Sequence, residues 1–559
     1  MLSSLVCLLA TGGAGQGIWP VRAKQELVIS DSAIASRVGA EILRQGGNAV
    51  DAAVATGFAL AVTHPAAGNI GGGGFMLVRM ADGKAVALDF RETAPKAASR
   101  DMYLDGAGKV VPSSSLIGYK ASGVPGTVAG LFEAHRRFGK LSWKALVEPA
   151  QQLAAKGFEV SFGLAGELQS ASPLLSLFPE SKRVFRGDGR GLEWGDRLIQ
   201  TDLAGTLARI RDRGPDGFYK GETADLIAKD MAAHGGLITK EDLAAYKVVV
   251  REPLAGSYRG YELLTMPPPS SGGVAILEML NVLEGYDFAA LPFGSSARNH
   301  LLVETMKRAF ADRAEYMGDP DFVKVPVAAL IDQWYAKSLR ASIRLDRATP
   351  ASEIKPGLAQ APDGNHTTHY TVVDKDGNAV ATTYTLNTGF GCGEAVEGAG
   401  FLMNNEMDDF ASKVGVPNGF GLIQGEANTI APGKRPLSSM VPTIVLKDGK
   451  LFMALGSPGG PTIINTVLQT LLNVIDDRMN VQEAVSAPRI HHQWLPDQIA
   501  WEPRGVAPDA LAAMEAMGHH FARRPGRMGS CHAIMVDPKT GFRFGGVDPR
   551  SEDAGAAGR

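Results

Sequence analysis

The spacing of apolar and polar positions divides this chain into a mainly helical first part and a strand-rich second part. The segment "DSAIASRVGAEILRQGG", which starts at Asp31, repeats apolar residues at helical spacing between an Asp–Ser cap and a Gly–Gly stop. The next helix, "NAVDAAVATGFALAV", is apolar on nearly every side, so we expect it to be buried. Helical patterns dominate from about residue 120 to residue 320.

Four segments have the pattern of two strands joined by a tight turn. One contains Asp82–Gly83, and the others are "HYTVVDKDGNAVATTYTL", "PTIVLKDGKLFMALGS" and "HAIMVDPKTGFRFGGV". Two sheets built from such strands, each covered by helices on its outer face, would form an α/β fold, a four-layer αββα sandwich. Because the strands come from both sides of residue 366, we expect residues 25–366 and 367–559 to share one core.

A segment without periodicity separates the two parts and ends in two threonines. This segment, "RATPASEIKPGLAQAPDGNH", predicts a loop, and Thr367 and Thr368 follow it. A β-branched residue here ordinarily begins a strand, and "NHT" is also an N-glycosylation sequon at Asn365. A threonine hydroxyl becomes a nucleophile when its own α-amine serves as base, which requires a cut at His366–Thr367.

Composition favours a small-molecule substrate. The formal net charge is −3 and no basic block occurs, so we expect neither a nucleic-acid nor a membrane partner. The cysteines Cys7, Cys392 and Cys531 lack the spacing of a zinc site, and we expect no metal. The N-terminal "MLSSLVCLLATGGAGQG" has the apolar and small-residue regions of a signal peptide but no basic region, so residues 1–24 are a possible signal peptide or its remnant.

Several long motifs occur in an order that resembles a known family. They are "NIGGGGFMLVR", "DFRETAP", "MPPPSSGG", "NHTTHYTVVDKDGNAVATTYTLNTGFG", "NNEMDDF", "GKRPLSSMVPTIV" and "GSPGG". Together they resemble the γ-glutamyltranspeptidases, which are N-terminal-nucleophile hydrolases. The resemblance implies a precursor that cuts itself at His366–Thr367 into a large subunit, 25–366, and a small subunit, 367–559. The two chains would form the αββα fold jointly, as a heterodimer that is periplasmic or secreted.

The resemblance also implies an activity and a set of site residues. It implies a γ-glutamyltransferase and glutathione hydrolase that needs no cofactor. The catalytic residues that it implies are Thr367, Thr385, Gly459 and Gly460. The substrate-binding residues that it implies are Arg91, Asn387, Glu406, Asp409, Ser438 and Ser439.

The chemistry of these residue types suits a γ-glutamyl substrate. A guanidinium and hydroxyl donors suit its carboxylate. Two carboxylates three positions apart, Glu406 and Asp409, can share one side of a helical turn and compensate an ammonium, although the ionisation of Glu406 stays open. Backbone N–H groups of a Gly–Gly pair can approach an oxyanion. Since neighbours in a strand point to opposite faces, we expect Thr368 and His369 to be structural. For Asp408 we expect a solvated or a structural role.

Two alternatives stay open. A cephalosporin acylase of the same family would cleave substrates that carry a carboxylate but no α-amine, and Asp409 argues against it. A non-catalytic glutamyl-binding protein would keep the pocket without the cut. One departure concerns the segment after "NNEMDDF", which resembles a lid loop whose tyrosine is replaced by Phe420, so we expect this lid to gate less tightly.

Overall fold

The computed structural model describes residues 18–186, 189–354 and 367–559. Most of the possible signal segment 1–24 lies outside these residues. The end of the predicted loop, including Asn365 and His366, also lies outside them.

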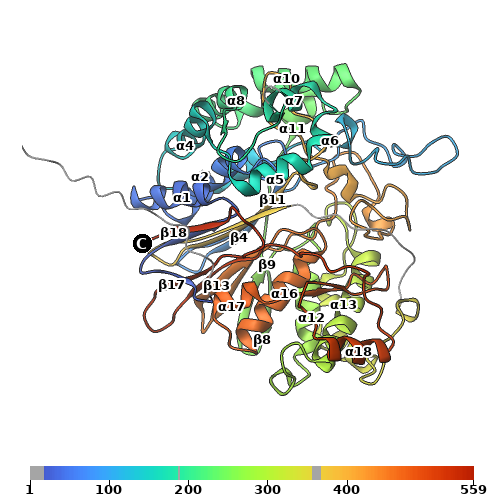
Figure 1. Ribbon diagram of the computed structural model, residues 1–559. Helices are drawn as coiled ribbons and strands as arrows, with labels where there is room; N and C mark the ends of the chain where they lie inside the picture. The colour runs from blue at the N-terminus through green and yellow to red at the C-terminus, as the bar shows by residue number, and fades with distance from the viewer. Residues whose placement is uncertain (1–17, 187–188, 355–366) are drawn as a thin grey trace, which may run out of the picture.

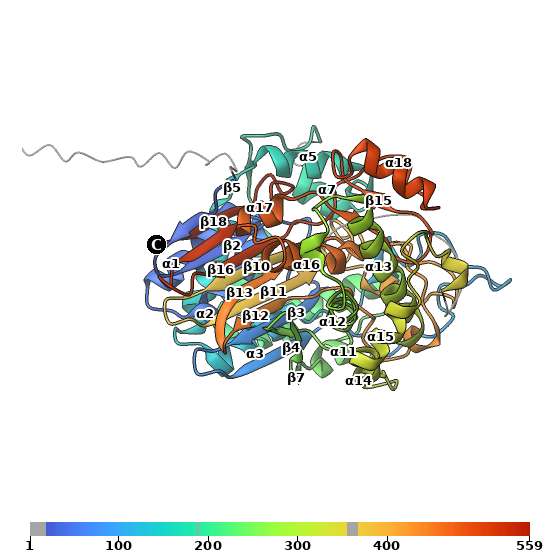
Figure 2. The ribbon, with the colours of Figure 1, turned by 90° about the horizontal axis from the view of Figure 1, so that it is seen from below.

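Two antiparallel seven-stranded sheets form the centre of the molecule (Figures 1 and 2). In the first sheet the order of strands is β1 (Val21–Ala23), β17 (Arg543–Gly546), β16 (His532–Val536), β13 (Lys450–Gly456), β12 (Thr443–Lys447), β9 (Tyr261–Thr265) and β8 (Leu254–Tyr258). In the second sheet it is β18 (Gly555–Gly558), β2 (Leu27–Ser30), β10 (Thr368–Val373), β11 (Ala379–Thr385), β3 (Gly73–Arg79), β4 (Ala85–Phe90) and β7 (Val249–Arg251). Two-residue strands form the small pairs β5 (Phe158–Glu159) with β6 (Arg197–Leu198) and β14 (Ile490–His491) with β15 (Ala500–Trp501).

Helices cover the outer face of each sheet, as Figure 1 shows. The helices on the second sheet are α1 (Ala33–Arg44), α2 (Ala49–Thr63) and α3 (Thr127–Phe138). Those on the first sheet are α12 (Gly272–Leu283), α16 (Thr462–Ile475) and α17 (Val481–Ser486). The inner faces of the sheets meet where β13 packs on β10 and β11. The predicted four-layer αββα sandwich is confirmed.

The remaining helices extend the two outer layers. On the side of α2 lie α4 (Trp143–Lys156), α5 (Phe162–Ser170), α6 (Ser172–Leu175), α7 (Pro179–Arg186), α8 (Thr201–Arg213), α9 (Asp216–Tyr219), α10 (Gly221–His234) and α11 (Lys240–Ala245). On the side of α12 lie α13 (Ser296–Tyr316), α14 (Val327–Leu330), α15 (Gln333–Ala341) and α18 (Pro508–Ala516). Short 3₁₀ turns are η1 (Tyr119–Ala121), η2 (Phe288–Ala290), η3 (Ala351–Glu353), η4 (Glu406–Asp409) and η5 (Glu426–Asn428).

Helix α2 shows why the apolar pattern predicted a buried element. Every residue from Ala49 to Thr63 is buried, between β10 and β11 on one side and α1, α3 and α4 on the others. Its N-terminus is closed by a capping box, in which the Asn48 side chain accepts from the Asp51 N–H and the Asp51 carboxylate accepts from the Asn48 N–H. Backbone donors that burial would otherwise leave unpaired are thereby satisfied.

Segments before and after residue 367 interleave within both sheets. The β10–β11 hairpin inserts between β2 and β3, with Tyr370 opposite Ser30 and Tyr384 opposite Gly74. In the other sheet, β12 pairs with β9 and β17 pairs with β1. With β18 paired to β2 as well, five strand pairs would hold the two pieces of a chain cut before Thr367 together.

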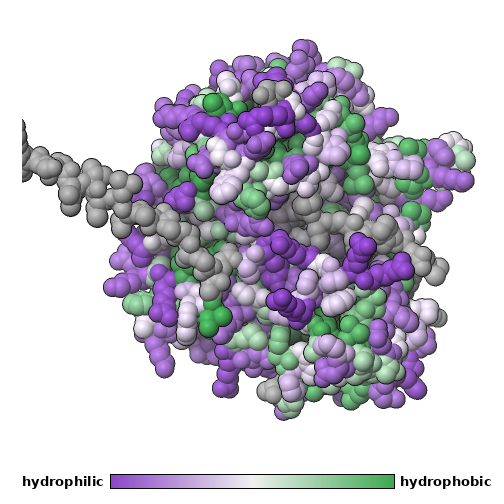
Figure 3. Space-filling model, in the orientation of Figure 1, coloured by the Kyte–Doolittle hydropathy of each residue, from purple (hydrophilic) through white to green (hydrophobic). Residues whose placement is uncertain are grey.

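The outer surface is mixed in character. Figure 3 shows hydrophilic residues over most of this face, with apolar residues scattered among them. Within the described part of the chain, no helix has both the length and the apolar character that a membrane crossing requires.

Candidate functional site

Thr367 lies immediately before β10, between the two sheets. It is 9% exposed. Its Oγ1 is 3.4 Å from the Oγ1 of Thr385, which is the last residue of the neighbouring strand β11. The Thr385 Oγ1 also accepts from the Asn387 N–H at 2.7 Å. Hairpin pairing, with Thr368 opposite Tyr384, therefore brings two threonines eighteen positions apart into contact.

Asn387 continues the chain from β11 toward the 3₁₀ turn η4. Its φ of 80° places it in the left-handed region, where asparagine is more frequent than other residues with a Cβ. Its Nδ2 donates to the Asn405 carbonyl at 3.0 Å, which links the end of β11 to the residue before η4.

Arg91 follows β4 and binds both acids of η4. Its Nη1 donates to Glu406 Oε1 and its Nη2 to Asp409 Oδ2. The Arg91 side chain is fully buried, and its Nε also donates to the Pro436 carbonyl at 3.2 Å. In a 3₁₀ turn, side chains three positions apart are aligned, which is why Glu406 and Asp409 reach the same guanidinium. The predicted alignment of these two acids is confirmed.

Three carboxyl groups share the charge of Arg91. Glu92 lies 3.7 Å from the Arg91 Nη1 and was not singled out by the sequence. Burial raises the pKa of Glu92 to about 7 and raises the pKa of Glu406 well above its ordinary value, although Arg91 opposes both shifts. Carboxylates this close also oppose one another's ionisation, so burial and mutual repulsion both favour the protonated forms of Glu92 and Glu406.

Ser438 and Ser439 lie in an extended segment that is fixed by the "MPPPSSGG" stretch. The Ser438 N–H donates to the Pro269 carbonyl at 2.9 Å, and the Ser438 carbonyl accepts from the Ser271 N–H at 2.8 Å. The Ser438 Oγ accepts from the Met440 N–H at 3.1 Å. The backbone therefore holds both serine side chains at the same edge of the site.

Gly459 and Gly460 form the turn that leads into α16. Both have positive φ, 130° and 52°. A Cβ on Gly459 would lie 2.4 Å from Thr462 Oγ1, and one on Gly460 would lie 2.9 Å from the Phe420 ring. Only glycine fits this turn without strain, and the positive end of the α16 dipole lies next to it.

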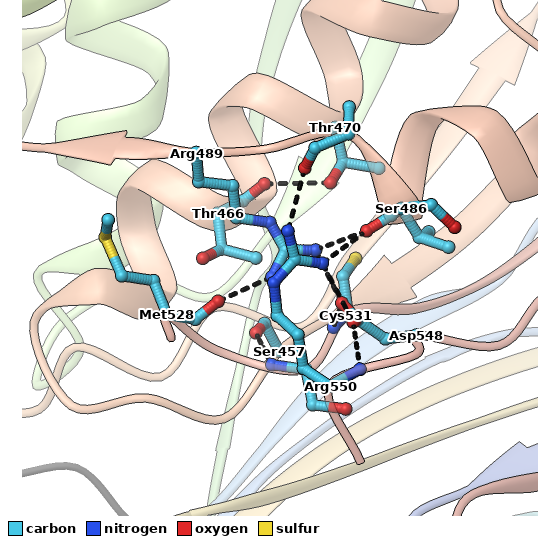
Figure 4. Close-up of polar contacts among 12 residues, drawn as sticks. Ser457, Thr466, Thr470, Ser486, Arg489, Met528, Cys531, Asp548 and Arg550 are labelled. Carbon is cyan, nitrogen blue, oxygen red and sulfur yellow. Dashed lines mark hydrogen bonds and ion pairs between the residues drawn. The ribbon is translucent and has the colours of Figure 1, made fainter. Parts of the chain in front are cut away.

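A buried ion cluster around Arg489 and Asp548 stabilises the segment that packs against this turn (Figure 4). Arg489 pairs with Asp548 and donates to the Met528 carbonyl at 2.6 Å, while Asp548 accepts from the Cys531 N–H at 2.7 Å. Residues 528 and 531 flank the glycine that packs against Gly459. The cluster thus holds this segment, and with it one wall of the turn.

The predicted site residues converge on one small pocket. Its free volume is about 20 Å³, room for one water molecule. Nine of the ten predicted residues line it, and Gly459 adjoins its neighbour Gly460. The lining residues are Arg91, Thr367, Thr385, Asn387, Glu406, Asp409, Phe420, Leu422, Ser438, Ser439, Met440, Gly460, Pro461 and Ile463.

The loop that contains Phe420 closes this pocket and is tied to the acids of η4. The Asn418 Nδ2 donates to Asp409 Oδ1 at 3.3 Å, and the Gly419 N–H donates to Asp408 Oδ2 at 2.7 Å. Asp408 also accepts from Ser115, and its burial raises its pKa to about 7. Of the two expectations for Asp408, the solvated one is wrong, since the residue is buried, and the structural one is confirmed, because this carboxyl anchors the loop.

His369 is structural for a reason other than the expected one. Strand alternation separates Thr368 from Thr367, but His369 is two positions on, so alternation does not exclude it. Instead its Nδ1 contacts Thr383 Oγ1 at 2.8 Å and its Nε2 contacts Thr371 Oγ1 at 2.9 Å. Burial lowers its pKa well below the ordinary value, so the ring is a neutral link between strands.

One cluster in the described residues has the composition of a metal site, and it lies outside the pocket. His300, Glu304 and His519 bring ligand atoms within 4.8 Å of one another. However, the His300 Nδ1 and His519 Nε2 are 2.7 Å apart, as in a hydrogen bond, and Glu304 pairs with Arg308. The facing nitrogens of the two histidines and the Glu304 carboxylate are thus engaged by protein partners.

Comparisons with known proteins identify the family of this chain. The sequence profile of the family described as Gamma-glutamyltranspeptidase matches residues 35–558. A glutathione hydrolase proenzyme of Escherichia coli is 53% identical over 96% of this chain and 93% of its own length. An acylase proenzyme, Acylase ACY 1 of a Pseudomonas species, is 42% identical over 93% of this chain and 91% of its own.

A solved structure shares the fold. The cephalosporin acylase from Bacillus halodurans superposes with a TM-score of 0.86 and 30% identity, over 97% of both chains. The family profile, the two relatives and this structure each span nearly the whole chain. The chain belongs to the gamma-glutamyltranspeptidase family of enzymes.

Proposed function

We propose that this protein transfers γ-glutamyl groups from glutathione and related amides to water, amino acids or peptides. The observation that carries the proposal is the position of Thr367. It lies immediately before β10, with its hydroxyl beside Thr385, in a pocket lined by one arginine, two acids and two serines. The relatives named as glutathione hydrolase proenzymes support the choice of substrate.

The proposed chemistry begins with a cut at His366–Thr367. The freed α-amine of Thr367 then takes the proton from its own Oγ1, which attacks the γ-carbonyl and forms a γ-glutamyl ester. The same amine returns the proton to the leaving amine. N–H groups of Gly459 and Gly460 would stabilise the oxyanion, each contributing on the order of 3 kcal/mol to the transition state. Water or an acceptor amine then releases the ester.

The other end of the substrate needs both signs of charge. Arg91 and the hydroxyls of Ser438 and Ser439 would bind its α-carboxylate. Its α-ammonium would lie near Glu406 and Asp409, with Asn387 beside them. Burial raises the pKa of Glu406, and an incoming ammonium would lower it again by favouring the carboxylate.

The same proposal covers processing and assembly. The large subunit 25–366 and the small subunit 367–559 would form a heterodimer, and the interleaved strands support this. Residues 1–24 would direct the protein to the periplasm or outside the cell, where glutathione and related peptides are the small-molecule partners.

A cephalosporin acylase is the second candidate, because relatives of that kind share the fold and much of the sequence. The two acids at the pocket favour a substrate with an ammonium. We therefore expect γ-glutamyl-p-nitroanilide to be cleaved at least about a hundredfold faster, in kcat/KM, than glutaryl-p-nitroanilide, which lacks only the α-amine.

The measurement follows release of p-nitroaniline from the wild-type enzyme, with glutaryl-7-aminocephalosporanic acid as a further substrate. The matched leaving group isolates the effect of the ammonium. Equal rates on the two anilides, or a preference for the glutaryl compounds, would identify an acylase instead. An uncut chain that binds glutamate without turnover would identify the non-catalytic alternative.

The loop over the pocket supplies a further prediction. The Phe420 ring packs on Gly460 and has no polar group to hold the loop across the pocket. We expect Phe420→Tyr, through its added hydroxyl, to slow entry of acceptor and water and to change the ratio of hydrolysis to transfer. Product analysis with and without glycylglycine measures this ratio, and Phe420→Leu is the control without a hydroxyl. An unchanged ratio in Phe420→Tyr would contradict the gating role.

A further inference from the structure

Arg313 is a buried cation next to the pocket that the sequence did not single out. It lies on α13 and is only 3% exposed. Its Nε donates to Ser271 Oγ at 2.9 Å and its Nη2 donates to Ser439 Oγ at 3.3 Å. Its Nη1 is buried and has no hydrogen-bond partner among the described residues.

The charge of Arg313 is not compensated by an ion pair. Across residues 18–186, 189–354 and 367–559, no carboxylate lies within 4.0 Å of its guanidinium, whereas the buried Arg298 and Arg489 each pair with an aspartate. Burial lowers the pKa of Arg313 to about 10, so the group remains charged at neutral pH. The charge of Asp409 favours the ionised guanidinium, but this carboxylate makes no ion pair with it. A buried charge without a close partner is costly, so an anion from outside the chain would complete the arrangement.

The direction of the hydrogen bonds shows where that anion would lie. A guanidinium has donors only, so both serine oxygens accept from it. The Ser271 hydroxyl donates its hydrogen to the Ser438 carbonyl at 2.7 Å and so has no hydrogen left for a ligand. The Ser439 hydroxyl has accepted from Arg313, and its own hydrogen has no acceptor among the described residues. Because Ser439 lines the pocket, this hydrogen is available to a ligand there.

Arg91 does not serve the same purpose by itself. Its two terminal nitrogens are already engaged by Glu406 and Asp409. Three carboxyl groups surround that single cation, so Arg91 alone offers a substrate carboxylate only part of its positive charge. Arg313 adds the positive charge that the carboxylate-binding edge of the pocket lacks.

We propose that Arg313 is the positioning residue for the carboxylate end of the substrate. It orients the Ser439 hydroxyl into the pocket, holds Ser438 through Ser271, and supplies the net positive charge. It acts through these serines and does not touch the reacting atoms. The inference deepens the proposed function and rests on a substrate that carries an α-carboxylate.

The test is a double-mutant cycle on the cleaved enzyme with γ-glutamyl-p-nitroanilide. We expect Arg313→Met to raise KM about 10- to 100-fold, as for loss of a hydrogen bond to a charged group, with little change in kcat. Ser439→Ala should raise KM as well, and the double variant should be little worse than Arg313→Met alone. Additive losses, or a loss confined to kcat, would overturn the inference.

A second substrate separates positioning from folding. In 4-aminobutyryl-p-nitroanilide only the α-carboxylate is missing, so the kcat/KM ratio of the two anilides should fall at least about tenfold in Arg313→Met. An unchanged ratio would mean a structural role. If Arg313→Met fails to fold or to cut itself, Arg313→Lys replaces it in the same double-mutant cycle. Lysine keeps the positive charge but cannot donate to both serines as the planar guanidinium does. A wild type without turnover of the γ-glutamyl anilide would refute the proposed function itself, before any variant is compared.

Discussion

Replacing Thr367 by alanine is expected to leave one uncut chain of full length with no measurable γ-glutamyl turnover. The substitution removes the hydroxyl that attacks the His366 carbonyl during processing and the γ-carbonyl during turnover. Loss of a catalytic nucleophile lowers kcat by on the order of 10⁶-fold. A denaturing gel and intact-mass measurement report the cut, and release of p-nitroaniline reports the rate.

Thr367→Ser is the matched control, because it keeps the hydroxyl and removes only the methyl group. It should yield two chains, more slowly, and retain part of the activity. Thr368→Ser is a second control, because it changes the junction but leaves the proposed nucleophile in place. The Thr368 Oγ1 donates to Asp31 at 2.7 Å, and serine keeps this hydroxyl. If Thr367→Ala still yielded two chains, cut at the same bond as in the wild type, self-cleavage by this residue would be refuted.

Replacing Arg91 by methionine is expected to destabilise the protein by about 3–5 kcal/mol. The change leaves the buried carboxyl groups of Glu92, Glu406 and Asp409 without their cation. The pKa values of Glu92 and Glu406 are already raised by burial, and loss of Arg91 raises them further. A carboxyl whose pKa is raised on folding loses its contribution to stability as pH rises. The loss should therefore be larger at pH 8 than at pH 5, as measured by urea denaturation of the uncut Thr367→Ala chain.

Arg100→Met is the matched control for this effect. Arg100 pairs with Glu426 at 2.7 Å, but both side chains are more than half exposed, so the same substitution should cost at most about 1 kcal/mol. Arg91→Met combined with Glu406→Gln should recover part of the stability at pH 8, since one buried carboxyl is gone. Equal losses in Arg91→Met and Arg100→Met would show that the cluster does not depend on its cation.

All the strands that the sequence revealed have local partners, although the local hairpin β8–β9 was missed. The four hairpins β3–β4, β10–β11, β12–β13 and β16–β17 form as predicted, because apolar alternation and a Gly turn act over a few residues. Strands such as β2, β7 and β18 were not singled out. They are short, and their partners lie far along the chain, as where β18 pairs with β2. Register of that kind depends on the assembled sheet.

The site residues likewise include some that the sequence predicted and some that only the structure revealed. Family motifs named ten residues, and the structure places nine of them around one pocket and the tenth beside it. Glu92 was missed although it adjoins Arg91, because adjacency along a chain does not reveal which side chains are buried together. Arg313 carried no signal, since on a helix of mixed composition an arginine is ordinarily a surface residue.

The sequence by itself determined the local elements, the junction at which Thr367 would become a chain end, and the residue types that the chemistry needs. Only the tertiary structure decided that Arg91 serves two acids from η4, that Asp408 anchors the loop over the pocket, and that Arg313 meets Ser439 without a carboxylate partner. The physical reason is burial. Periodicity and turn chemistry act between near neighbours, whereas the protonation of Glu406 and the unpaired charge of Arg313 depend on groups that only the packed sheets bring together.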